Sequence, residues 1–225
     1  MIKAVVFDLD NTLIDFMRMK RTSIDAALNA MLGSGLEMEK EKASKKLYDL
    51  YSKHGIEHQK IFQKFLKKVT GEIDYRILAA GVVAYRKAQV GVLQPYAMVM
   101  PTLIKLREKG LKLAIVSDAP RFNAWIRLVE MHIHDFFDVV VTFEDTKKRK
   151  PDKAPFEVAL NKLKLKPGEC LMVGDWPERD IKGAKELGMK TAFAKYGAIK
   201  EVTIKADYEL NKIEDVMKII EKENS

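Results

Sequence analysis

Short apolar runs alternate with amphipathic stretches along most of the chain, a pattern typical of βαβ units and a parallel sheet. Beyond Gly110, apolar runs predict strands over residues 111–116, 138–142, 169–173, 190–194 and, with a weaker pattern, 207–209, and residues 1–7 supply a further strand. Helical spacing lies between these runs, over residues 100–109, 121–131, 155–163, 179–187 and 213–222. The alternation predicts an α/β fold with a parallel sheet.

Residues 16–94 break this rhythm, because their apolar positions recur at intervals of three and four and strand-forming composition is nearly absent. The spacing predicts four helices, over residues 18–32, 39–53, 58–69 and 74–89. Glycines near residues 33–35, 55 and 71 separate them. We therefore expect two domains: residues 1–15 with 95–225 form the sheet domain, and residues 16–94 form an inserted helical domain.

The composition is that of a folded protein: of 225 residues, 47% are hydrophobic and 32% are charged. No apolar run approaches the roughly 20 residues that a membrane-spanning helix needs. The first residues also lack the basic region and the small-residue cleavage site of a signal peptide. We expect a soluble, cytoplasmic protein that binds no membrane.

The net charge of +8 is concentrated in one segment, since residues 16–94 hold eleven Lys and four Arg against eight acids. These lysines are interleaved with glutamates, which favours solvated helix faces over a nucleic-acid surface. A positive domain can also attract anionic phosphorylated substrates. We expect a small phosphorylated metabolite as partner and no nucleic acid, and a monomer, with a homodimer as the alternative.

Polar side chains follow four of the predicted strands at or near the point where each strand ends. They are Asp8, Asp10 and Thr12 after the first strand, Ser117 and Asp118 after residues 111–116, Lys150 beyond residues 138–142, and Asp175 and Asp180 beyond residues 169–173. Ligands of a parallel sheet gather at the carboxyl ends of its strands. We therefore expect these side chains to meet at one edge of the sheet.

Asp8 and Asp10, with Asp175 and Asp180 nearby, bring four carboxylates to this edge, against Lys150 as the single obvious base. Such crowding is costly without a cation, and a set of oxygen ligands without His or Cys favours Mg²⁺ over zinc or copper. A carboxylate beside Mg²⁺, a hydroxyl and a lysine suits phosphoryl transfer, in which a carboxylate can serve as a covalent nucleophile. A second carboxyl two residues away can protonate the leaving alkoxide and later take a proton from water.

The motifs Asp8-Leu9-Asp10-Asn11-Thr12, Ser117, Lys150-Pro151 and Gly174-Asp175 with Asp180, in this order and each after a strand, resemble the four motifs of the haloacid dehalogenase-like (HAD) hydrolases. The resemblance covers essentially the whole chain, and it implies a Rossmann-like core with residues 16–94 as a C1-type helical cap. The chain is also similar to archaeal members of subfamily I, some of which carry a glyceraldehyde-3-phosphate phosphatase label, and to phosphoglycolate phosphatases.

The resemblance implies a role for each motif residue. Asp8 would be the nucleophile and Asp10 the general acid and base. Mg²⁺ would be bound by Asp8, the backbone carbonyl of Asp10 and Asp175, with Asp180 in support. The remaining groups would hold the phosphoryl group or shape the loops around it. They are Thr12, Ser117, Asp118, Lys150 and the backbone N–H groups of Leu9 and Asp118. Asp118 stands where Asn is more usual in relatives, so the role of its side chain stays open.

Several alternatives remain. The same scaffold also carries 2-haloacid dehalogenases and phosphomutases, and a non-catalytic protein that binds phosphate esters is a further possibility. Asp10 favours a phosphatase over a dehalogenase, because an alkoxide leaving group needs a proton and a halide does not. Trp176, beside Asp175, either covers the site or packs under its loop. Cys170, among apolar neighbours, is interpreted as a buried hydrophobic residue.

Overall fold

The computed structural model describes residues 1–199 and 204–225, which divide into two compact units. Met1–Asp15 and Gln94–Ser225 form the sheet unit, and Phe16–Leu93 form the helical unit. The chain leaves the sheet unit after Asp15 and returns to it at Gln94. Among the helices described, none is long and apolar enough to cross a bilayer.

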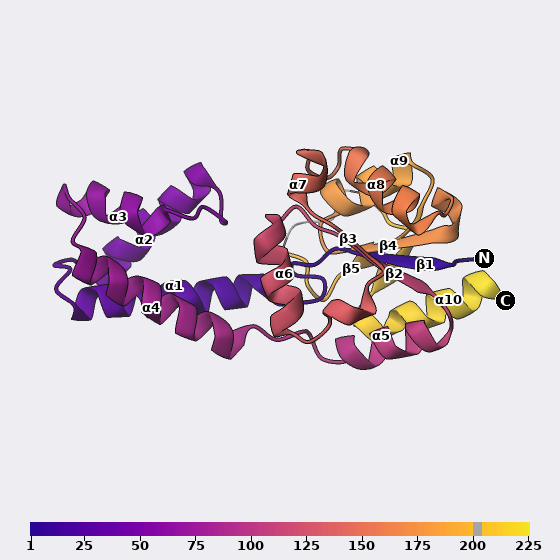
Figure 1. Ribbon diagram of the computed structural model, residues 1–225, viewed down its shortest axis with the longest axis horizontal. Coiled ribbons are helices and arrows are strands. Elements are labelled where there is room, and N and C mark those ends of the chain that lie inside the picture. Colours follow the sequence, from indigo (N-terminus) through magenta and orange to yellow (C-terminus); the bar gives the residue numbers. More distant parts are fainter. Residues whose placement is uncertain (200–203) are drawn as a thin grey trace. The chain divides into compact units, whose positions relative to one another are not determined.

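Six parallel strands form one sheet in the order β3-β2-β1-β4-β5-β6 (Figure 1). They are β1 (Ala4–Phe7), β2 (Lys112–Val116), β3 (Val139–Val141), β4 (Cys170–Gly174), β5 (Lys190–Ala194) and β6 (Tyr208–Leu210). The predicted α/β fold is confirmed, and every predicted strand is present with slightly different ends. The strand order reverses between β1 and β4, which is where sheets of this kind bind their ligands.

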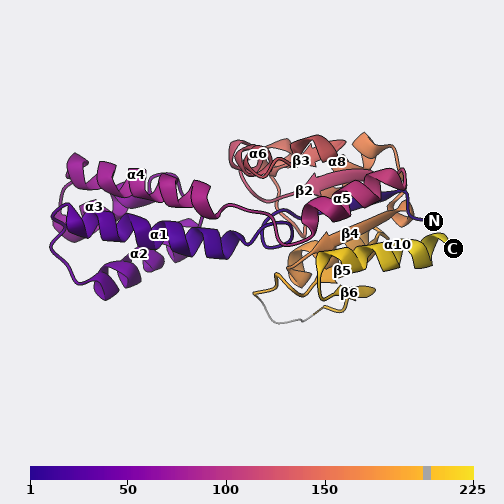
Figure 2. The same cartoon turned by 90° about the horizontal axis from the view of Figure 1, so that it is seen from below.

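The helices of the sheet unit are α5 (Val99–Glu108), α6 (Arg121–Glu130), α7 (Phe143–Thr146), α8 (Ala154–Leu163), α9 (Lys182–Glu186) and α10 (Val216–Asn224), with 3₁₀ turns at His134–Phe136, Pro167–Glu169 and Ile213–Asp215. Figures 1 and 2 show α8 and α9 over one face of the sheet and α5 and α10 over the other. Strand residues such as Val6 and Met172 pack against Phe156 and Leu160 of α8. Because both faces of the strands are covered, the strands read as continuous apolar runs.

The helix predicted over residues 179–187 starts earlier than its pattern indicates. A π-helical turn at Pro177–Ile181 precedes α9. Proline is tolerated in a first turn because its missing N–H would have no partner within the helix. The carbonyl of Trp176 accepts the N–H groups of Arg179 (3.0 Å) and Asp180 (2.8 Å), which fixes this turn directly after the loop that holds Asp175.

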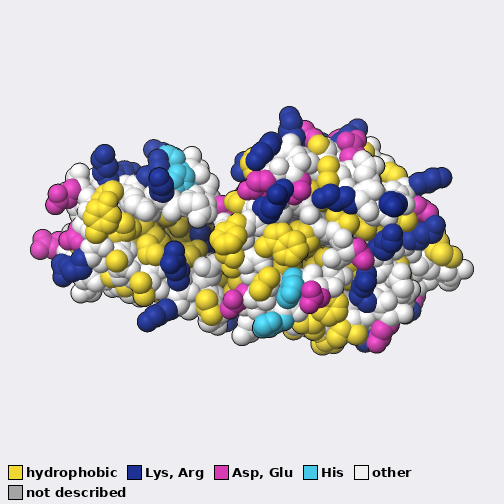
Figure 3. All heavy atoms as spheres, viewed as in Figure 1, with side chains coloured by type: hydrophobic (Ala, Val, Ile, Leu, Met, Phe, Trp, Pro, Cys, Tyr) yellow, Lys and Arg dark blue, Asp and Glu magenta, His cyan; other side chains and the backbone are white. Residues whose placement is uncertain are grey.

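The helical unit consists of α1 (Phe16–Gly33), α2 (Lys40–His54), α3 (Ile61–Thr70) and α4 (Tyr75–Val92). Gly71 ends α3 in the left-handed conformation that an L-residue rarely adopts, and Asp74 caps α4 by accepting the N–H groups of Arg76 and Ile77. Four helices are therefore present where four were predicted. On the face seen in Figure 3, Lys and Arg side chains of this unit are scattered, with hydrophobic and acidic side chains between them.

Candidate active site

The ends of β1, β2 and β4 lie at the same level of the sheet. Phe7, the last residue of β1, is in register with Ile115 of β2 and Val173 of β4. Each strand runs into a loop at that level, and the N–H of Asp8 still bonds to the carbonyl of Val173 (2.9 Å). The loops that carry Asp8, Ser117 and Asp175 therefore start side by side.

Lys150 connects these loops through its ammonium group. Its Nζ atom forms an ion pair with Oδ1 of Asp8 and another with Oδ1 of Asp180 (2.7 Å), and it donates to the carbonyl of Val116 (2.9 Å). Burial by itself would lower the pKa of Lys150, but the carboxylates of Asp180, Asp8 and Asp118 outweigh it and raise the pKa above its ordinary value. Lys150 is therefore a fixed positive charge at every physiological pH.

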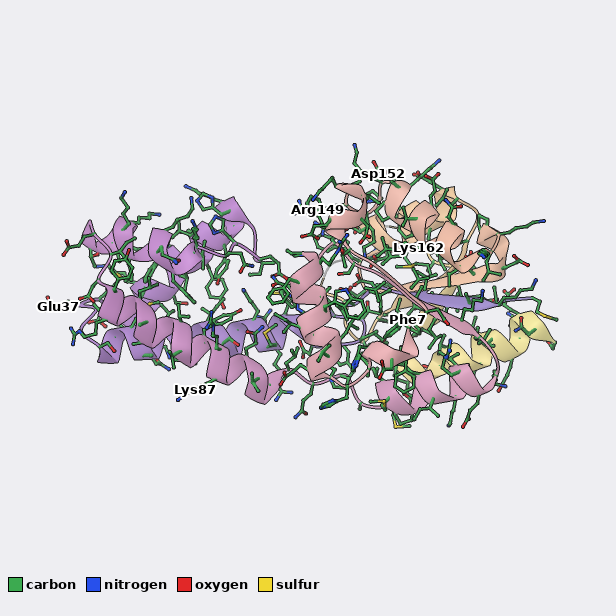
Figure 4. All side chains as sticks on the ribbon, viewed as in Figure 1. Phe7, Glu37, Lys87, Arg149, Asp152 and Lys162 are labelled. Carbon is green, nitrogen blue, oxygen red and sulfur yellow. The ribbon has the colours of Figure 1, made fainter. Side chains whose placement is uncertain are left out.

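Lys150 is the buried member of a run of basic residues. Lys148 and Arg149, directly before it, are exposed, and Figure 4 shows the Arg149 and Asp152 side chains at the surface of the sheet unit. The side chain of Lys150 is 3% exposed, against 63% for Lys148. The sequence prediction singled out Lys150 from this run, and the structure places it beside Asp8.

Three carboxylates, those of Asp8, Asp175 and Asp180, are buried together. Each offers an oxygen, and these oxygens lie within 4.8 Å of one another. Loss of hydration, and then the charges of Asp8 and Asp180, raise the pKa of Asp175. Loss of hydration also raises the pKa of Asp180, against the opposing effect of Lys150. The cluster is thus an unfavourable place for three negative charges unless a cation joins Lys150 there.

The Asp180 carboxylate is a member of this cluster, like those of Asp8 and Asp175. Its Oδ2 atom accepts the N–H of Trp176 (3.0 Å), which folds the π-helical turn back onto the end of β4. Gly174 makes room for it, since a Cβ atom at Gly174 would lie 2.4 Å from Cγ of Asp180. A helix-starting role alone does not explain a carboxylate that is 1% exposed and paired with Lys150.

Thr12 and Asn11 shape the loop after β1. The Thr12 hydroxyl lies 3.4 Å from Oδ2 of Asp8 and 3.3 Å from Oδ1 of Asp175, so it touches both carboxylates. Asn11 adopts a left-handed backbone conformation (φ 59°), which asparagine tolerates better than most residues.

Two residues after β5 support this loop and were not predicted from the sequence. Tyr196 donates its hydroxyl to the carbonyl of Thr12 (2.8 Å), and a Cβ atom on Gly197 would lie 1.6 Å from the carbonyl oxygen of Asn11. The requirement for glycine at position 197 comes from a backbone that approaches across the sheet, which no local pattern reveals.

Ser117 follows β2 directly and is 4% exposed. Its N–H bonds to the carbonyl of Val141 (2.9 Å), and its hydroxyl oxygen accepts the N–H of Ala119 (3.1 Å). The hydroxyl proton is thus left to donate to an incoming oxygen. The preceding residue, Val116, gives its carbonyl to Lys150, so Ser117 lies next to the ammonium group.

The side chain of Asp118 ties three loops together. One carboxylate oxygen accepts the backbone N–H of Lys150 (2.9 Å), and the other pairs with Nη1 of Arg179 (3.2 Å). The Arg179 guanidinium lies 3.8 Å from the centre of the Trp176 ring. Asp118 therefore holds the backbone of Lys150 in place, and Trp176 packs under Arg179 in this loop.

Asp118→Asn is expected to change kcat by less than about threefold, because the amide oxygen can still accept the Lys150 N–H and the lost ion pair with Arg179 is partly exposed, worth about 1 kcal/mol or less. Asp118→Ala removes the acceptor as well and is expected to cost about tenfold in kcat. Steady-state kinetics of the two variants would check this. Equal losses in both would show that the charge, not the acceptor, is what matters.

The Asp10 carboxylate pairs with a buried arginine. Its two oxygens lie 3.0 and 2.7 Å from Nη1 of Arg127, in the middle of α6. Arg127 was not predicted, because an arginine in an amphipathic helix gives no sign that it is buried. The predicted metal contact of Asp10 was through its backbone carbonyl and stays a prediction.

His54 and His58 lie in the helical unit, at the end of α2 and after it, with their tilted rings 5.2 Å apart between centroids. Lys20 is buried there too, where it donates to the Tyr85 hydroxyl (2.9 Å). Cys170 is buried in the sheet core, and burial raises its pKa to about 12, which leaves the thiol protonated and unreactive.

Comparisons of sequence and structure find known proteins that are similar to this chain. A sequence model of haloacid dehalogenase-like hydrolases matches residues 2–188. The chain is 33% identical over 222 residues to the glyceraldehyde 3-phosphate phosphatase of Methanocaldococcus jannaschii, covering 98% of this chain and 97% of that protein. It is 30% identical over 232 residues to the pyrophosphatase PpaX of Bacillus cereus, covering 99% and 98%. The crystal structure of a HAD phosphatase from Thermococcus onnurineus is similar, with a TM-score of 0.72, 26% identity and coverage of 97% and 98%.

Proposed function

The chain belongs to the haloacid dehalogenase-like hydrolases, and on that basis we propose that it is a magnesium-dependent phosphatase that hydrolyses small phosphate monoesters through a phosphoryl group carried on Asp8. The observation that carries the proposal is the buried contact of Lys150 with Asp8 and Asp180, next to Asp175, where β1 and β4 end. A nucleophile, a fixed positive charge and a set of metal ligands thus share one place.

The residues present fit a magnesium ion. The cluster of Asp8, Asp175 and Asp180 offers three oxygen ligands, the kind that Mg²⁺ prefers. Three carboxylates against the ammonium group of Lys150 leave two negative charges, which one divalent cation balances. When bound, Mg²⁺ would neutralise charge on the phosphate oxygens as the carboxylate approaches.

In the first half of the reaction, an oxygen of Asp8 forms a bond to phosphorus and the bond from phosphorus to the substrate oxygen breaks. Lys150 and the Ser117 hydroxyl are placed to donate to the phosphate oxygens, which lowers the repulsion between the phosphate and Asp8. Asp10 would give its proton to the leaving alkoxide. The Thr12 hydroxyl keeps the Asp8 carboxylate in a fixed orientation for this attack.

In the second half, water attacks the phosphorus and the bond to Asp8 breaks. Asp10, which has lost its proton to the alcohol, takes one proton from this water. Asp8 returns to its carboxylate form next to Lys150, and inorganic phosphate leaves.

For the substrate, we propose a small phosphorylated metabolite such as glyceraldehyde 3-phosphate or phosphoglycolate. The first is supported by relatives of that name that align over nearly the whole chain. The excess of basic residues in the helical unit suits an anionic substrate. A dehalogenase or a phosphomutase is the alternative, but a halide leaving group gives no use for the carboxyl of Asp10.

A panel of phosphate esters, with p-nitrophenyl phosphate as a reference, tests the proposal. Phosphate release is expected with Mg²⁺, and removal of the metal by EDTA is expected to lower kcat more than about 10²-fold, with recovery when Mg²⁺ is added back. Chloride release from 2-chloropropionate and phosphate transfer to glucose 1-phosphate are assayed in parallel. Full activity in EDTA would exclude the metal, and chloride release without phosphate release would establish the dehalogenase.

A further inference from the structure

We infer that Arg127 is a positioning residue for Asp10, a role that rests on the proposed function. The pair joins positions 117 residues apart, from the loop after β1 to the middle of α6. Its consequence is that the Asp10 carboxylate keeps a fixed place after it has given its proton to the alcohol.

Burial sets this pair apart from the other arginine ion pairs of the sheet unit. The Arg127 side chain is 3% exposed, whereas the side chains of the arginines that pair with Asp118, Asp138 and Asp145 are 38%, 42% and 52% exposed. An exposed pair contributes little, but a buried guanidinium requires a partner because it cannot lose its proton. Asp10 supplies that partner.

The distribution of buried charged side chains in the sheet unit also links Arg127 with the site. Within the described residues of this unit, the charged side chains classed as buried are Asp8, Arg127, Lys150, Asp175 and Asp180. All except Arg127 belong to the cluster at the strand ends. Arg127 reaches that region through Asp10, two residues after the nucleophile.

The contact geometry fixes the orientation of the Asp10 carboxylate. Nη1 of Arg127 lies 3.0 Å from Oδ1 and 2.7 Å from Oδ2, so one guanidinium nitrogen contacts both oxygens and restricts rotation of the carboxylate. The pair therefore holds the carboxylate in one place while water attacks the phosphorus.

Loss of Arg127 is expected to lower the rate of the second transfer most. Water forms a bond to phosphorus, the bond from phosphorus to Asp8 breaks, and one water proton goes to the Asp10 carboxylate. An Asp10 side chain without Arg127 samples other rotamers, and a misplacement of about 1 Å can cost about 10²-fold in rate. With p-nitrophenyl phosphate, whose leaving group needs no proton, the first half stays fast.

The experiment is rapid-mixing kinetics of Arg127→Met with p-nitrophenyl phosphate and Mg²⁺. We expect a burst of one nitrophenolate per enzyme, then a steady rate about 10²-fold below that of the wild type, with the phosphoryl group retained on the protein after acid quench. A second aryl phosphate with a different leaving group is expected to reach the same steady rate, because the slow step is shared. Arg121→Met, on the same helix, is the control and is expected to behave as the wild type.

Two further variants separate positioning from folding. Arg127→Lys keeps the charge and is expected to recover part of the steady rate. In an Asp10→Asn background, Arg127→Met is expected to add no further loss, because the group it positions is gone. An unchanged steady rate, a loss without a burst, or additive losses with Asp10→Asn would overturn the role of Arg127. Absence of a trapped phosphoryl group in the wild type after acid quench would instead overturn the proposed function.

Discussion

Asp8→Asn is expected to lower kcat by at least about 10⁴-fold, since the amide nitrogen and oxygen are poor nucleophiles and no phosphoryl group can then be carried on this residue. The change is nearly isosteric. The side-chain amide can still contact the Thr12 hydroxyl and, through its oxygen, the ammonium group of Lys150. Substrate binding and the fold are therefore expected to survive, and the loss is expected in kcat, not in KM.

The measurement is acid-quench trapping with a ³²P-labelled substrate, together with steady-state kinetics. The wild type is expected to retain label on the protein and Asp8→Asn none. Asp135→Asn is a suitable control, because the Asp135 side chain is 92% exposed and lies in a short turn after α6. A variant at position 8 that turns over at a rate near that of the wild type would remove Asp8 as nucleophile and leave direct attack of water as the mechanism.

The sheet and most of its site could be predicted because the information is local. An apolar run followed at once by polar residues identifies both a strand and its end, as at Asp8 and Ser117, and parallel pairing then brings the ends together. The four motifs in order identified the family, which the comparisons confirm. Asp180 was predicted as support only, the role that the resemblance implied, and its distance from Lys150 depends on the unpredicted π-helical turn.

The unpredicted residues reach the site across the fold. Tyr196 and Gly197 follow β5 and meet the loop after β1. From the sequence, Arg127 is expected at the surface of its helix. The structure instead buries Arg127 and exposes Phe122 and Val129 of the same helix. An apolar pattern here misleads about which helix face turns inward. The Asp10 carboxylate explains why Arg127 can be buried, because it neutralises the guanidinium there.

Lys150→Met is expected to abolish turnover and also to destabilise the metal-free protein by about 3–5 kcal/mol at neutral pH, because it leaves buried carboxylates without their partner. The pKa values of Asp175 and Asp180 lie above the ordinary value of 3.8. Their carboxyls are therefore protonated in both states at low pH, and as pH rises the unfolded chain gives up its protons first. Stability of the variant is expected to fall from about pH 4 through neutral pH, more steeply than that of the wild type.

Mg²⁺ is expected to restore much of this stability at neutral pH without restoring activity, since a cation bound to the folded state stabilises it by mass action and offsets the same charges. Chemical denaturation at several pH values, with EDTA or with Mg²⁺, measures both effects. Lys148→Met, two residues earlier and 63% exposed, is the control and is expected to stay within about 0.5 kcal/mol of the wild type. A Lys150→Met variant whose stability depends on neither pH nor Mg²⁺ would mean that the three carboxylates do not share their charge. The metal site and the role of Lys150 would then fail together, because both follow from the excess negative charge at the ends of β1 and β4.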